Sequence, residues 1–422
     1  MSYRLIVLCF AVIVAQFSGA PKVFGAEVSE QPAWFEKSMA REKKVRRTAK
    51  FKLPDGILKG RMPGKLVTKP ENSEGSWYFS SNIGTEAPFE CAYFEEPLNA
   101  AFSTKLLGDN VVAAMVESVG PLQSKAISAV DASHVEGRPV LALEWIYTVG
   151  PKDKAQVGLA KVRSTTIGET LLLCFHNELG YRATFESAFA KVVASVEGST
   201  QEPAYYESLY IQSVNSQPVG FVQTSFSLDA DGDTRSLLVS TALVPVDART
   251  LSTSDSTTVS YSTPEGELIN ALHSNAENGE LVIDLELRPQ EGQGWQVAGD
   301  FQGKPLDQEI DSSAELLSEL GQVLATAELQ RSTDKNSATL ATWLPDVDPT
   351  SLLPVEIVLN AADRNSGQMT VGGIDMQVQL DRSGNMIAGT GKAGSATVVI
   401  ERVWERGQIP APKQEQERRQ QQ

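Results

Sequence analysis

The stretch Ile374-Asp375-Met376-Gln377-Val378-Gln379-Leu380 alternates apolar and polar side chains, one residue at a time. Successive side chains of a β-strand point to opposite faces, so the alternation predicts a strand with one dry face and one wet face. Leu281 to Leu287 repeats the pattern almost a hundred residues earlier. Antiparallel sheets commonly keep one face in water, whereas parallel sheets are buried on both faces. These two stretches therefore predict antiparallel sheet in the second half of the chain.

The sequence around these stretches reads as many short strands with frequent turns. Gly220 to Leu228 and Arg235 to Val244 flank Asp229-Ala230-Asp231-Gly232-Asp233, which is typical of a hairpin turn. One helix is expected near Ser312 to Leu320. We therefore predict an antiparallel β-rich domain over 204–408, of curved-sheet or half-barrel type. Residues 409–422 have the composition of a disordered tail.

The first half of the chain predicts a smaller α+β module over 53–200. Strand composition is clear at Trp77-Tyr78-Phe79, Cys91 to Phe94 and Val140 to Tyr147. From 182 to 196, apolar residues recur at helical spacing, so one stripe of the helix can cover a sheet. The predicted fold class is α+β: an antiparallel sheet with a covering helix, followed by the large β domain.

Two parts of the chain resemble known families. Cys174-Phe175-His176-Asn177-Glu178-Leu179-Gly180-Tyr181, followed by a helix that ends in Val-x-x-Ser, resembles the end of PsbP-like α/β modules of exported proteins, over about 50–200. Val219-Gly220 and Asp381-Arg382-Ser383-Gly384 are similar to strings in uncharacterised β-rich exported bacterial domains, over about 205–407. The latter domains resemble half-open lipid-binding barrels. The resemblance implies a bacterial origin and brings no catalytic residues.

The N-terminus has the anatomy of a secretory signal over residues 1–26. Arg4 precedes an uncharged, mostly apolar run from Leu5 to Phe17, which is shorter than the roughly 20 residues of a membrane-spanning helix. Small residues then allow cleavage after Ala20, Gly25 or Ala26. The alternative is an uncleaved anchor. We expect a periplasmic or secreted protein.

The cysteine count agrees with export. Cys9 leaves with the signal, and Cys91 and Cys174 remain. An even number in an oxidising compartment predicts a disulfide, which would close a loop worth roughly 4 kcal/mol in the chain-entropy model. The alternative is two buried free thiols.

Charge is distributed unevenly along the chain. Residues 1–200 hold 23 basic and 21 acidic residues, whereas residues 201–410 hold 11 and 30. The acidic second half argues against nucleic-acid binding, because it would repel a polyanion. The stretch from Lys37 to Lys69 holds 12 basic residues and only two acids, Glu42 and Asp55. We predict a basic helix or arm over 27–52, which could contact anionic headgroups, a partner protein or the acidic half of the chain itself. Its candidate surface residues are Lys37, Arg41, Lys43, Lys44, Arg46, Arg47, Lys50 and Lys52.

Several short motifs resemble metal, nucleotide or catalytic sites, but the residues around them do not support such a site. Cys174 and His176 form only one pair of zinc-type ligands, and a zinc site needs three or four. The Asp229 to Asp233 segment lacks the glycine and glutamate of a calcium loop. Gly389 to Gly394 matches G-x-G-x-x-G, but strand patterns flank it on both sides, so a hairpin is expected and not a nucleotide site. No G-x-S-x-G is present, and the histidines His134, His176 and His273 have no recognisable setting. No metal, cofactor or nucleotide is predicted.

The leading hypothesis is a non-catalytic exported envelope protein that binds a protein partner or an apolar, lipid-like ligand through the β domain. One alternative is a hydrolase whose site assembles from dispersed residues, such as one of the histidines with an Asp and a Ser. Another is a structural protein docked on an anionic membrane surface through residues 37–69, in peripheral contact with lipid.

Overall fold

The computed structural model describes residues 32–73, 75–94, 120–151, 154–168, 170–198, 204–290, 294–310 and 316–409. The predicted signal and nearly all of the predicted tail lie outside these residues. The described chain splits into two compact units. The first runs from Pro32 to Gly198 and includes Leu243–Thr253; the second takes in Ala204 to Ala242 and Ser254 to Ile409.

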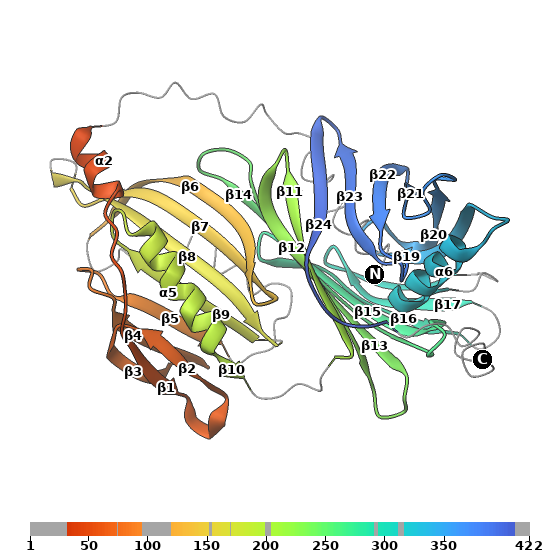
Figure 1. The fold of residues 1–422 in the computed structure, drawn as a ribbon, viewed down its shortest axis with the longest axis horizontal. Helices are drawn as coiled ribbons and strands as arrows, with labels where there is room; N and C mark the ends of the chain where they lie inside the picture. The colour runs from red at the N-terminus through yellow and green to blue at the C-terminus, as the bar shows by residue number, and fades with distance from the viewer. Residues whose placement is uncertain are drawn as a thin grey trace. The chain divides into compact units, whose positions relative to one another are not determined.

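The N-terminal unit is built on a seven-stranded antiparallel sheet of order β3-β4-β5-β9-β8-β7-β6 (Figure 1). A second, three-stranded sheet has the order β1-β2-β10. The strands are β1 Thr48–Lys52, β2 Leu58–Pro63, β3 Lys65–Ser73, β4 Ser76–Asn82, β5 Phe89–Phe94, β6 Leu122–Val135, β7 Arg138–Val149, β8 Gln156–Ile167, β9 Thr170–Asn177 and β10 Glu197–Gly198. A short 3-10 turn, η1 Pro54–Gly56, joins β1 to β2.

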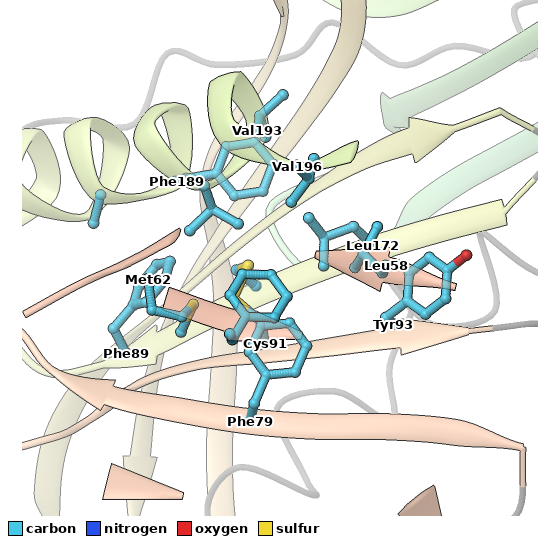
Figure 2. Close-up of a cluster of buried hydrophobic side chains, with 14 of the residues drawn as sticks. Leu58, Met62, Phe79, Phe89, Cys91, Tyr93, Leu172, Phe189, Val193 and Val196 are labelled. Carbon is cyan, nitrogen blue, oxygen red and sulfur yellow. A yellow bond between two sulfur atoms is a disulfide. The ribbon is translucent and has the colours of Figure 1, made fainter. Parts of the chain in front are cut away.

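Helix α5, Arg182–Ser195, covers one face of the larger sheet, as its apolar spacing predicts (Figure 1). Its buried side chains are nearly all apolar and meet those of β4, β5 and β9, together with β1 and β2, in what we call the α5 core (Figure 2). Cys91 and Cys174 lie directly opposite each other on β5 and β9, and their sulfur atoms are joined in a disulfide inside this core. Both residues are almost completely buried.

The segment predicted as a basic helix or arm is neither one helix nor a free arm. Within the described part of this segment, 32–52, only α2, Ala33–Met39, is an α-helix, and Thr48–Lys52 joins a sheet as β1. Between them, the Glu42 carboxylate accepts hydrogen bonds from the backbone N–H groups of Ala183 (2.9 Å) and Thr184 (2.7 Å). Residue Tyr181, at the N-cap of α5, offers no side-chain cap, so Glu42 supplies the missing acceptor and a favourable charge at the helix N-terminus.

The second unit is one open antiparallel sheet of fourteen strands, which we call the curved sheet. Its order is β18-β17-β16-β15-β14-β13-β12-β11-β24-β23-β22-β21-β20-β19. The strands are β11 Tyr206–Val214, β12 Gln217–Leu228, β13 Thr234–Pro245, β14 Leu251–Ser262, β15 Leu268–Glu277, β16 Glu280–Pro289, β17 Trp295–Phe301, β18 Lys304–Ile310, β19 Ser337–Leu344, β20 Asp348–Leu359, β21 Ser366–Val371, β22 Ile374–Leu380, β23 Met386–Ala393 and β24 Ala396–Gly407. The predicted fold class, a covered antiparallel sheet followed by a large curved β domain, is confirmed.

Helix α6, Glu319–Arg331, is the helix expected near Ser312 to Leu320, but it begins later than predicted. Ser318 is its N-cap and accepts a hydrogen bond from the N–H of Gly321. The helix buries polar residues such as Gln322 and Thr326 beside apolar ones, so no apolar stripe marks its extent in the sequence.

Turn chemistry in the curved sheet follows the sequence closely. Asp229 Oδ1 accepts from the backbone N–H groups of Asp231 and Asp233, which makes the Asp-rich string the tip of the β12–β13 hairpin. The glycine-rich string Gly389 to Gly394 lies at the end of β23 and in its turn to β24. Both strings are hairpin elements, as predicted.

Candidate binding face of the curved sheet

One face of the curved sheet is covered by α6, and we call it the inner face. Leu320 of α6 packs against Tyr206 of β11 and Phe226 of β12. Tyr206 and Phe226 lie opposite each other in the strand register, so every second residue from them along β11 and β12 shares the inner face. The register then extends this face across the neighbouring strands.

From β20 to β24 the inner face is apolar, and we call this the apolar half. Met369 lies opposite Met376, and Met376 opposite Gly391, so that two methionines and a glycine form one cross-strand row. The outer face of the same strands carries Glu, Gln, Thr and Lys, as the alternation in Ile374–Leu380 predicts. Buried apolar residues of this half are Val355, Ile357, Leu359, Met369, Val371, Met376, Val378, Leu380, Val398 and Ile400.

From β11 to β15 the inner face is rich in hydroxyl and amide groups, and we call this the polar half. Strand β14 shows it best, because every second residue from Ser254 to Ser262 carries a hydroxyl and is buried. Ser260 donates a hydrogen bond to the buried carboxylate of Glu319 in α6, which places these hydroxyls on the inner face. The polar half consists of Ser208, Gln212, Thr224, Ser236, Ser240, Ser254, Ser256, Thr258, Ser260, Ser262, His273 and Asn275.

Five hydroxyl and amide oxygens of the polar half are buried and have no hydrogen-bond partner within the described chain. They are Gln212 Oε1, Thr224 Oγ1, Ser236 Oγ, Ser256 Oγ and Ser262 Oγ. The five residues are at most 3% exposed. A buried polar group without a partner costs about 1–3 kcal/mol, so five would cost as much as the whole stability of a typical domain. These atoms therefore point to a polar partner on the inner face, either ordered water or a bound molecule.

His273 is the centre of a buried network at the edge of the polar half. Its Nδ1 lies 2.9 Å from Thr258 Oγ1, and its Nε2 lies 3.1 Å from Asp346 Oδ2. Asn275 donates to the other carboxylate oxygen of Asp346 at 2.7 Å. Asp346 comes from the turn between β19 and β20, so the network ties that turn to β15. The histidine and the threonine are 1% and 2% exposed, and both imidazole nitrogens lie close to a partner, so the network is part of the buried packing of this face.

The predicted basic residues divide into two groups. Arg41 is half-buried: its guanidinium donates to Leu179 O at 2.9 Å, lies 3.5 Å from Glu178 and stacks over the ring of Tyr181. Lys43 donates to Gly84 O at 2.6 Å. The other six are exposed and form no ion pair with any residue that the structure describes: Lys37, Lys44, Arg46, Arg47, Lys50 and Lys52.

Lys50 and Lys52 lie on the outer face of the three-stranded sheet, on either side of the buried Phe51. The register places Lys50 opposite Arg61 and Lys52 opposite Lys59 on β2. All four residues are exposed, and Lys59 pairs with Glu197 of β10 at 2.6 Å. The face therefore carries two directly opposed pairs of like charges, which destabilise a sheet.

Two buried ionisable residues of the N-terminal unit also lie away from water. His176 Nε2 lies 3.2 Å from Thr85 Oγ1, and burial, reinforced by the charge of Lys161, lowers its pKa to about 3. Lys161 donates to the backbone carbonyls of Glu178 and Gly180, and burial lowers its pKa to about 8. His176 is thus part of the packing beside the disulfide, and Lys161 holds the turn that leads into α5.

Sequence reasoning missed the polar half of the curved sheet. Its signal is present in Leu251-Ser252-Thr253-Ser254-Asp255-Ser256-Thr257-Thr258, where hydroxyls fill almost every position. Such a string reads as an exposed strand or a loop, because sequence alone does not show that a helix covers one face. The partners of His273 were also hidden, since Asp346 is distant in sequence and belongs to a turn.

No known family model matches the sequence, and no curated protein matches it significantly. Among solved structures, the chain is similar to a β-barrel-like protein of the domain of unknown function DUF1849 from Brucella abortus, with 11% identity and a TM-score of 0.37, covering 49% of this chain and 98% of that one. It is also similar to the cyanobacterial PsbP of Synechocystis sp. PCC 6803, with 16% identity and a TM-score of 0.24, covering 36% and 92%. The likenesses are weak, and they give the chain neither a family nor a function.

The disulfide fits an oxidising compartment. None of the helices among the described residues combines the length and the apolarity of a membrane span.

Proposed function

We propose that this protein is a non-catalytic periplasmic or secreted protein, exported by a cleaved signal, that binds an amphipathic, lipid-like molecule on the inner face of the curved sheet. The observation that carries the proposal is the division of that face into an apolar half and a polar half with unpartnered buried hydroxyls. An acyl chain would pack on the methionines and valines of β20–β24. A polar head would supply hydrogen bonds to Gln212, Thr224 and Ser256.

Native mass spectrometry of the full chain, purified without detergent, tests this proposal. We expect a mass above that of the mature oxidised chain and release of a lipid-like molecule on denaturation. Met376→Gln, on the inner face, should lower the bound fraction, whereas Gln377→Ala, its outward-facing neighbour, should not. A bare mass, together with no saturable binding of palmitate or phosphatidylglycerol, would overturn it.

The hydrolase hypothesis has one supporting observation, the Thr258–His273–Asp346 array. A hydroxyl, an imidazole and a carboxylate in a row are the parts of an activated nucleophile. The same contacts also fit a structural network, because Asp346 holds the β19–β20 turn against β15 through His273 and Asn275. Labelling of the native protein by a fluorophosphonate probe, and its loss in Thr258→Ala, would favour the hydrolase; an unlabelled wild-type protein would exclude this site.

A second candidate function is docking on an anionic membrane surface, and the opposed like charges on β1 and β2 favour it. Such pairs work against the sheet, and an anionic surface would offset their repulsion. Each basic residue near an anionic surface contributes about 1 kcal/mol, so Lys50→Gln with Arg61→Gln should weaken vesicle binding roughly 30-fold. Lys43→Gln is the matched control, because Lys43 is already bound to Gly84. Binding to phosphatidylglycerol vesicles that is absent, or insensitive to salt, would exclude this function.

A further inference from the structure

A recess of about 320 Å³ opens on the α5 side of the seven-stranded sheet, next to strands β6, β7 and β8. Its floor includes Ala129 and Ala142, whose small side chains leave space between larger neighbours. Ala142 lies in the register between Asp131 on β6 and Arg163 on β8. In the next row, Glu144 lies between Ala129 and Lys161. The recess lies in the N-terminal unit and is separate from the inner face of the curved sheet.

Three acids and three bases line this recess, and five of the six already have partners. Arg182 pairs with Glu144 at 2.7 Å, and Arg163 pairs with Glu186 at 3.3 Å. Lys161 donates to the carbonyls of Glu178 and Gly180. Asp131 remains: it is half-buried and forms no ion pair with any part of the chain that the structure describes.

Among the described residues, no positively charged side chain forms an ion pair with Asp131. Burial raises the pKa of its carboxyl, and the positive charge of Arg163 partly opposes that rise. Asp131 and Arg163 therefore interact through space without touching, across the width of two inter-strand spacings, or about 10 Å between backbones. A cation at Asp131 would supply the missing charge.

Arg163 is held weakly by its present partner. Its Nη2 lies 3.3 Å from Glu186 Oε1, and the Glu186 side chain is 58% exposed, whereas that of Arg163 is only 15% exposed. Because the Glu186 carboxylate of this pair is exposed to water, its attraction to Arg163 is screened, so a carboxylate entering the recess can replace it. A guanidinium is well suited to that exchange, because it binds a carboxylate through two parallel hydrogen bonds.

We propose that this recess binds a small zwitterion, with its ammonium group on Asp131 and its carboxylate on Arg163 in place of Glu186. The separation of the two residues fits a molecule whose charges are a few methylene groups apart, such as an ω-amino acid. Ala129 and Ala142 leave room for those methylenes. This binding is independent of the ligand proposed for the curved sheet.

Isothermal titration calorimetry of the full oxidised chain with γ-aminobutyrate tests the site, with butyrate and butylamine as single-charge probes. We expect γ-aminobutyrate to bind at least tenfold more tightly than either probe. Asp131→Asn should weaken γ-aminobutyrate binding at least tenfold and leave butyrate unchanged. Glu186→Gln should strengthen γ-aminobutyrate binding severalfold, because it frees Arg163.

Two controls separate binding from folding. Glu136→Gln changes an exposed acid in the β6–β7 turn, outside the recess, and should leave binding unchanged. Thermal unfolding of each variant should match the wild type. Absence of heat with γ-aminobutyrate would overturn the proposal. Equal binding of butylamine, or weaker binding in Glu186→Gln, would do the same, because each contradicts the paired-charge recognition.

Discussion

The two helices of this molecule cover their sheets in opposite ways. Under α5, buried side chains such as Phe185, Phe189 and Val193 meet the apolar face of β5 and β9 around a disulfide. Under α6, buried side chains include Glu319, Gln322 and Thr326, and the polar half of the curved sheet adds unpartnered hydroxyls. Apolar burial stabilises a fold directly, whereas buried polar atoms need partners. The α5 core is thus built for stability, whereas the inner face of the curved sheet contains buried polar atoms that require partners.

The largest expected change in the free energy of unfolding comes from a substitution in the α5 core. Phe189→Ala should lower the free energy of unfolding by about 4–5 kcal/mol, because Phe189 is fully buried and the truncation leaves a cavity. Urea unfolding, with hydrogen exchange of α5 peptides to localise the change, measures this loss. Ser187→Ala, on the exposed side of the same helix, should change little. A loss below 1 kcal/mol would contradict the picture of a tightly packed core.

Removing the disulfide should have the next largest effect. Cys91→Ser with Cys174→Ser opens a loop with a sequence separation of 83 residues. The chain-entropy model gives a loss of roughly 4 kcal/mol, confined to the N-terminal unit. Hydrogen exchange should therefore rise in β5, β9 and α5 while the curved sheet stays protected. An equal rise in both units would show that the disulfide stabilises more than the α5 core.

The next largest expected effect is a dependence of folding stability on pH, caused by His176. Its pKa is about 3 in the fold and about 6.5 when unfolded, so the unfolded chain binds the extra proton between these values. Stability is therefore lost as the pH falls from about 6.5 towards 3, by about 2 kcal/mol at pH 5. Lys161 titrates near 8 and lies outside this window. His176→Phe should flatten the slope between pH 7.5 and pH 5; an unchanged slope would assign the effect to other groups.

The smallest expected change in stability is at the polar half of the curved sheet, where a hydroxyl without a partner can be compared with one that has a partner. Thr224→Val replaces an unpartnered hydroxyl by a methyl group, so the ligand-free protein should be unchanged or more stable by about 1 kcal/mol. Thr241→Val is the matched control, since Thr241 donates at 2.7 Å to the buried carboxylate of Asp255. That change should cost about 1–3 kcal/mol. If both variants lose the same stability, the hydroxyl of Thr224 has a partner in the ligand-free protein.

Most of the fold could be predicted from the sequence, because its strands have regular patterns. The alternation in Ile374–Leu380 predicted both the strand and its wet face, and the spacing of Phe185 and Phe189 predicted α5. The start of α6 could not be predicted from apolar spacing, because the helix is buried on several sides and mixes Gln322 and Thr326 with its leucines. Local pattern also could not show that Glu42 caps a helix about 140 residues later.

The candidate sites were less accessible to sequence reasoning than the fold. The basic residues can be identified in the sequence. Only the structure shows that Lys50 lies opposite Arg61 on the neighbouring strand, and that the Arg41 guanidinium is engaged in a hydrogen bond within the fold. The recess depends on Ala129 and Ala142, two small residues that have no chemical signature of their own. Both results come from side chains brought together across strands, which a linear pattern does not contain.

The pairing of β11 with β24 has a consequence for how the chain acquires its structure. Strands β11–β18 and β19–β24 each form a run of neighbours in chain order, and the seam between the two runs joins residues such as Val214 and Val398. This long-range pairing requires the closure of a large loop, which is slow compared with hairpin formation. During folding, two half-sheets with open edges are therefore expected to precede the finished domain. A chain terminated before Ala396 would keep those edges exposed and should aggregate.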